Sequence, residues 1–138
     1  MGLTLEVCVE SVAGLAAAVE GGADRVELCS ALGLGGLTPS VGFMALAARC
    51  GVPVLAMIRP RAGDFVWSEA ELGVMEADIA AARDAGLAGV VLERHERLAG
   101  APALKQDLDQ AQLVARLPQP LGNANSPRIT GPWPHSPA

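Results

Sequence analysis

Apolar and polar positions follow two distinct periods along the first two thirds of the chain. Four short segments, at 3–9, 24–29, 52–58 and 87–92, either alternate apolar with polar residues or are continuously apolar, which is typical of β-strands. Between them, apolar residues recur three and four positions apart, which predicts amphipathic helices. The expected order is therefore strand, helix, strand, helix, strand, helix, strand.

The start of each predicted helix carries a local signal. Ser11 is a good N-cap for the first helix, because its hydroxyl can accept from a free backbone N–H. The second is expected to begin at Thr38-Pro39, since proline at the first helical position gives up no needed hydrogen bond. Ser68 and Glu71 have the spacing of a capping box and should start the third.

Alternation of strands and helices with short connections predicts an α/β fold with a parallel sheet and right-handed crossovers. Residues 101–116 are expected to form one more helix, because four apolar residues there would share a side. The segment 117–138 holds six of the ten prolines and shows no periodicity. We therefore expect one domain over 1–116, followed by a Pro-rich disordered tail over 117–138.

Composition narrows the class of protein. The chain is 51% hydrophobic, which is enough for a buried core, and it carries a formal net charge of −5 without a basic cluster. Nucleic-acid binding is not expected, because it needs a concentrated basic face. A membrane span is not expected either, since no long uninterrupted apolar run occurs. Three cysteines fit a reduced cytosolic protein better than a disulfide scaffold.

A Glu-x-Cys triplet occurs on both of the first two predicted strands, as Glu6–Cys8 and Glu27–Cys29. Residues two apart on a strand project from the same face, so each carboxylate should accompany its thiol. The alternate residues are apolar and should pack beneath the helices. The Glu and Cys side chains then face the other side of the sheet, near the carboxyl ends of the strands, where α/β proteins bind ligands.

Two thiols on neighbouring strands suggest a metal site. Soft thiolate ligands favour Cu(I) or Zn, and a two-coordinate site suits Cu(I) better than Zn. Met57 on the third strand is a further soft neighbour for Cys8 and Cys29. Packing inside a reduced core remains the commoner role for such cysteines, and the spacing alone favours it.

The loop after the third strand suggests a different chemistry. Arg59 and Arg61, with Asp64 close by, can grip a carboxylate or phosphate through bidentate hydrogen bonds. Glu27 would then be the acid or base of an enzyme. Equally, either arginine can form a structural ion pair with Glu6, Glu27 or Asp64.

Several motifs together resemble one known family. "EVCVES", "GGADRVELCS", "GGLTPSVG", "MIRPRAGDFVWSE" and "GVV" are similar to the N-terminal half of the copper homeostasis protein CutC, over roughly residues 4–92. The resemblance implies a cytoplasmic TIM barrel linked to copper tolerance, with copper(I) bound by Cys8 and Cys29. It also gives the barrel-mouth residues the look of an enzyme site, whose members are Glu6, Glu27, Arg59, Arg61 and Asp64.

The chain is short for that fold. A full barrel needs about 200–250 residues, and this chain has 138. We therefore expect about half a barrel, with four strands, flanking helices and free edges that favour a homo-oligomer. The leading hypothesis is cytoplasmic copper(I) binding. The alternatives are an enzyme acting on a small anionic or phosphorylated molecule, and a fragment without function.

Overall fold

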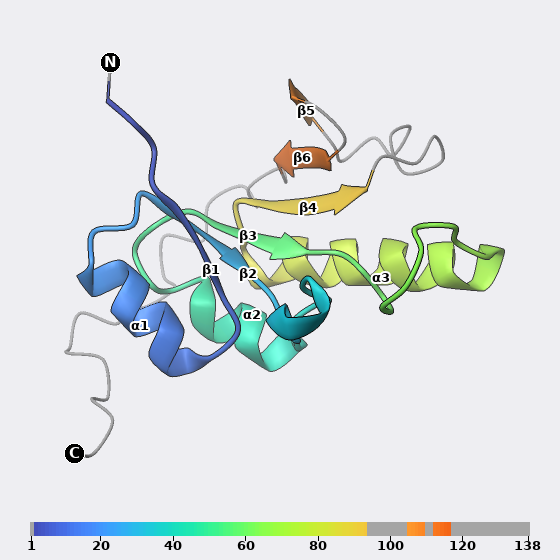
Figure 1. The fold of residues 1–138 in the computed structure, drawn as a ribbon, viewed down its shortest axis with the longest axis horizontal. Helices are drawn as coiled ribbons and strands as arrows, with labels where there is room; N and C mark the ends of the chain where they lie inside the picture. The colour runs from blue at the N-terminus through green and yellow to red at the C-terminus, as the bar shows by residue number, and fades with distance from the viewer. Residues whose placement is uncertain (1, 94–104, 110–111, 117–138) are drawn as a thin grey trace.

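Six strands form one sheet in the order β1-β2-β3-β4-β6-β5 (Figure 1). The computed structural model describes residues 2–93, 105–109 and 112–116. The strands are β1 (Glu6–Val9), β2 (Arg25–Leu28), β3 (Val54–Met57), β4 (Gly89–Glu93), β5 (Lys105–Asp109) and β6 (Gln112–Arg116). The helices are α1 (Val12–Glu20), the 3₁₀ turn η1 (Leu32–Leu34), α2 (Val41–Ala47) and α3 (Glu69–Ala85).

The first four strands confirm the predicted α/β order. β1, β2, β3 and β4 are parallel neighbours in chain order, and a helix lies in each connection. Each parallel strand is only four or five residues long, slightly shorter than the apolar pattern indicated. This is the arrangement expected of part of a (β/α) barrel.

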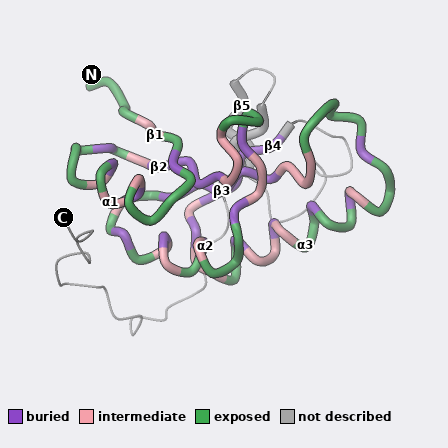
Figure 2. The backbone as a smooth tube through the Cα atoms, turned by 60° about the horizontal axis from the view of Figure 1, so that its bottom comes forward, coloured by how far each residue is buried: buried purple, intermediate pink, exposed green. Residues whose placement is uncertain are grey.

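The three α-helices pack against one face of the parallel strands, and the main core lies between them (Figure 1). Alternate strand residues supply the sheet side of this core, because successive side chains point to opposite faces. Figure 2 shows buried backbone concentrated in the strands, whereas the outer turns of the helices are exposed. The fully buried members of this core with the largest side chains include Leu15, Leu28, Met44, Ile58, Met75, Leu87 and Leu92.

Two of the three predicted helix starts are confirmed. The Ser11 hydroxyl accepts from the Gly14 N–H at 3.0 Å, and Ser68 and Glu71 form the complete capping box. The second prediction is wrong, because α2 is capped by Ser40 rather than begun at Thr38-Pro39. The Thr38 hydroxyl instead accepts from the backbone N–H of Arg59 at 2.9 Å, which ties this loop to the end of β3.

The predicted helix over 101–116 is also wrong where the structure describes it. Residues 105–109 and 112–116 form the antiparallel pair β5 and β6, and β6 pairs along the whole of β4. The free edge of β4 offers a row of backbone donors and acceptors, which β6 pairs with and which a helix over 101–116 would leave unpaired. Tertiary pairing therefore overrides local preference here.

Other expectations fall outside the described residues. The Pro-rich segment 117–138 lies there, so the proposed domain boundary at 116 stays a prediction. Within the described part of the chain, no helix is both long enough and apolar enough to cross a bilayer.

The capping box of α3 provides a stability test. We expect Ser68→Ala to lower the free energy of unfolding by about 1 kcal/mol, because the Glu71 N–H loses its acceptor. Ser68→Asp, which keeps an acceptor at the same position, should stay close to the original protein in urea unfolding. Equal stability of all three proteins would show that the cap contributes nothing.

Candidate functional site

The candidate site lies on the sheet face that the helices leave free. A small second cluster of buried residues, separate from the main core, marks this face and includes Cys29, Leu55, Met57 and Val91. Val26 and Leu28 belong to the main core instead, which confirms that Glu27 and Cys29 point the opposite way. The side chains of β2 therefore alternate between the two faces as the sequence predicts.

Strand register decides how the two Glu-x-Cys triplets meet. Glu6 lies opposite Arg25, and Cys8 lies opposite Glu27, so the two cysteines are not directly across from each other. Cys29 sits one pleat further along β2, on the diagonal from Cys8. The sequence predicted neighbouring thiols, but the structure places a carboxylate next to both of them. The Cys29 Sγ makes a weak 3.9 Å contact with Glu27 Oε1.

Glu6 has its own cation on this face. Its carboxylate forms an ion pair with Arg25 across the β1–β2 register. Glu6 therefore does not need Arg59 for neutralisation, contrary to one expectation from the sequence. Glu27 has no ion pair among the described residues, although its exposed fraction is only 9%.

Burial controls the protonation of this cluster. Desolvation, reinforced by the Glu6 carboxylate, raises the pKa of Glu27 above its ordinary value of 4.5. Desolvation, followed by the charge of Glu27, raises the pKa of Cys29 to about 12. The pKa of Cys8 is raised by burial first and by Glu27 second. Both thiols are therefore protonated at neutral pH.

A glycine-rich loop closes over Cys29. Gly36 has a φ of +94°, and a Cβ there would lie 3.4 Å from Cys29 Sγ and 3.7 Å from Met57 Cε. The loop thus brings its backbone against a thiol and a thioether at once. This loop consists of η1 followed by two glycines with positive φ, Gly35 and Gly36, and is held by a Ser30–Leu37 bridge.

The sequence allowed an ion pair between Arg59 and Glu6 or Glu27, but Arg59 pairs with neither of them. Its guanidinium donates to backbone carbonyls, with Nη1 bonded to Leu34 O at 2.8 Å and to Gly36 O at 3.4 Å. Nη2 donates to Gly63 O at 3.1 Å, and the Phe65 ring lies 4.9 Å from the guanidinium carbon. Arg59 therefore joins the glycine-rich loop to the loop after β3.

Arg61 forms structural ion pairs, which is one of the two roles that the sequence left open. It forms ion pairs with Asp64, at 3.1 Å, and with Glu71 at the start of α3. It also donates to Val66 O at 2.8 Å and lies over the Trp67 ring. With its donors used inside the loop, Arg61 has little capacity left to bind a ligand.

The aromatic pair of this loop, Phe65 and Trp67, was not predicted from the sequence. Phe65 and Trp67 meet edge to face with their ring centroids 6.1 Å apart. The chain has only two Phe and two Trp in all, so their occurrence two positions apart was the available signal. Both rings line a pocket that also contains Arg59.

The described residues offer few side chains that could bind one metal ion together. Among the described residues, no three His, Cys, Asp or Glu side chains are placed to share one ion. The donors on the free sheet face are instead the Cys8 and Cys29 thiols with the Met57 thioether nearby. This set is soft and small, so it suits Cu(I) and does not suit four-coordinate Zn.

A family model and several known proteins match this chain. The model of the CutC family matches residues 3–123. Family protein CutC of Rhizobium meliloti (strain 1021) is 70% identical over 90 residues, which make up 65% of this chain and 37% of that protein. Its counterpart in Vibrio vulnificus (strain CMCP6) is 56% identical over 92 residues, or 66% of this chain and 37% of that protein.

A solved structure shows the same fold. A crystal structure described as copper homeostasis protein CutC from Streptococcus agalactiae matches with a TM-score of 0.59 and 36% identity. The match covers 64% of this chain and 44% of that chain. The present chain therefore spans less than half the length of these relatives.

Glu27 generates a prediction about stability and pH. Because its folded-state pKa is raised, it contributes most stability below its ordinary pKa of 4.5, and this contribution is lost as pH rises through the folded value. Glu27→Gln removes the buried charge and should raise the free energy of unfolding at pH 7 by on the order of 1 kcal/mol. Urea unfolding from pH 4 to pH 8 measures this effect.

The control for Glu27→Gln is Glu20→Gln, at the exposed end of α1. It removes one carboxylate without touching the site. The difference in stability between Glu27→Gln and the original protein should widen from low to neutral pH. A constant difference across the pH range would contradict a raised Glu27 pKa.

Proposed function

Because the chain belongs to the CutC family, we propose that it serves copper homeostasis in the cytoplasm by binding copper(I) through Cys8 and Cys29. The proposal rests chiefly on one observation: two thiols from adjacent parallel strands share the sheet face opposite the three described α-helices. The solved relative described as a copper homeostasis protein supports the same role.

The two cysteines differ in a way that suits capture of an ion. Cys8 is exposed, whereas Cys29 is 1% exposed beneath the glycine-rich loop. An incoming ion would meet Cys8 first and then Cys29, which lies on the diagonal across β1 and β2. The nearby Met57 thioether offers a neutral soft donor without adding charge beside Glu27.

Protons must leave when the thiols bind copper(I). The raised pKa values of Cys8 and Cys29 keep both thiols protonated until an ion replaces the protons. Glu27, which lies next to both thiols, is the nearest group able to accept a proton. Arg25, Glu6 and Glu10 are further charged groups on this part of the face.

Cysteine variants test the site directly. In an anaerobic Cu(I) titration with a competing chelator, we expect the original chain to bind about one ion that the Cys8→Ser, Cys29→Ser double variant does not bind. Cys50→Ser is the matched control, because Cys50 is buried in the helix-side core and its Sγ contacts Val52 O. Unchanged stoichiometry in the double variant would overturn the proposal.

The dependence of binding on pH is a second test. Each thiol proton released raises the apparent binding constant by about tenfold per pH unit while the pH stays below the thiol pKa. Release of two protons therefore predicts a rise of about a hundredfold per unit between pH 6 and pH 8. Competition titrations at three pH values give this slope. A slope near zero would exclude these two thiols as the ligands.

A further inference from the structure

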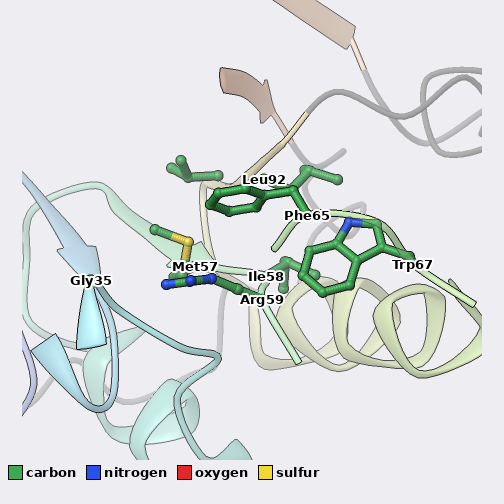
Figure 3. Close-up of a pocket in the computed structure, with 8 residues that line it drawn as sticks. Gly35, Met57, Ile58, Arg59, Phe65, Trp67 and Leu92 are labelled. Carbon is green, nitrogen blue, oxygen red and sulfur yellow. The ribbon is translucent and has the colours of Figure 1, made fainter. Parts of the chain in front are cut away.

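A pocket at the carboxyl ends of β3 and β4 is separate from the two cysteines (Figure 3). Its empty volume is about 350 Å³, including the part open to solvent. Figure 3 shows Arg59 and Met57 beneath the Phe65 ring, with Trp67 on the neighbouring side. Its position is that of a small-molecule site, since ligands of α/β proteins bind where parallel strands end.

Arg59 enters this pocket with donors left over. A guanidinium has five N–H groups, and the three hydrogen bonds of Arg59 use Nη1 twice and Nη2 once. One N–H on Nη2 remains, and the buried Nε has no hydrogen-bond partner. Two donors on adjacent nitrogens match the two oxygens of one carboxylate.

The charge of Arg59 is also uncompensated. Arg25, Arg61 and Arg83 each form an ion pair, whereas no carboxylate among the described residues pairs with Arg59. Its partners are carbonyl oxygens and the Phe65 ring, which hold the cation in place without neutralising it. A partly buried, preorganised cation of this kind favours an anion.

A second lining residue, Trp67, also has a donor without a partner. Its exposed fraction is 8%, and its indole N–H has no hydrogen-bond partner. Buried unpaired donors cost stability, and a ligand that brings acceptors removes that cost. The remaining lining is apolar and includes Met57, Val91 and Leu92, which leaves room for a small carbon skeleton and for no second charge.

From these contacts we propose that the pocket binds a small organic carboxylate that carries a second oxygen acceptor. The carboxylate pairs with the Nε and Nη2 of Arg59, and the second oxygen accepts from the Trp67 indole. Arg61 is a positioning residue, because its bonds to Asp64, Val66 and Glu71 hold the loop that carries both rings.

Phe65 acts as the lid of this site. Its ring covers the guanidinium and is itself 49% exposed, so it can turn outward without leaving a core. The Nε of Arg59 is shielded from solvent in this structure. Binding as proposed therefore includes movement of a covering side chain, and Phe65, which lies over the guanidinium, is the exposed one.

The test uses lactate as the probe and neutral lactamide as its isosteric control. Both are titrated into the full ¹⁵N-labelled chain, with readouts at the Gly35 and Gly63 amides and the Trp67 indole N–H. We expect saturable shifts with lactate, at a dissociation constant on the order of 1 mM, and no saturable shift with lactamide. Equal responses to both probes, or no saturation by lactate, would overturn the proposal.

Variants locate the site. Arg59→Lys keeps the charge but loses the planar fork, so lactate should bind about tenfold more weakly or worse. The same change at Arg83, which lies on α3 outside the pocket lining, should leave lactate binding unaltered. Binding to Arg59→Lys as tight as to the original chain would contradict the proposal.

A second variant covers the case in which Arg59→Lys fails to fold. Trp67→Phe keeps a ring in the core but removes the free N–H, so it should weaken lactate several-fold, as read at Gly35 and Gly63. Unchanged affinity would remove Trp67 from the site. The Cys8→Ser, Cys29→Ser double variant should bind lactate normally, which separates this site from copper binding.

Discussion

The packing of three helices against one face of the parallel strands decides where the functional side chains of this protein lie. Once Val26, Leu28 and their counterparts on β3 and β4 are buried beneath the helices, every alternate residue must point to the other face. That face receives two carboxylates, two thiols and a thioether. Shifting one strand by a single residue would bury its polar groups in the core. Packing on the helix side therefore fixes the strand register for both faces of the sheet.

The sheet face opposite the helices brings carboxylates and thiols close together, and this arrangement controls their protonation. Glu27 is buried between two thiols and beside Glu6, and desolvation opposes the charged forms of Glu27, Cys8 and Cys29. The pair between Glu6 and Arg25 supplies local compensation, but within the described part of the chain Glu27 has no cation of its own. The two thiols therefore keep their protons at neutral pH, as a site that exchanges protons for a metal ion would require.

Arg59 and Arg61, in the loop after β3, have different roles, which the sequence alone does not distinguish. Arg61 is fully engaged by Asp64, Glu71 and the loop backbone, so it shapes the loop. Arg59 is held by carbonyl oxygens, which fix its position and leave its charge available. The same residue type thus serves structure at one position and keeps a free charge at the other, because among the described residues only Arg61 meets carboxylates.

Local pattern was enough to predict the four parallel strands, the three helices between them and the shared face of each Glu-x-Cys triplet. These follow from side-chain period and capping, which depend on neighbours in the chain. The predicted helix at 101–116 failed because the free edge of β4 pairs with residues 112–116, a partner that local pattern cannot see. Likewise, only the register puts Glu27 opposite Cys8, and only the folded loops give Arg59 carbonyl partners instead of a glutamate. Sequence determined which faces exist and what they carry, whereas tertiary structure decided which groups meet, since contact across strands and loops depends on register and closure.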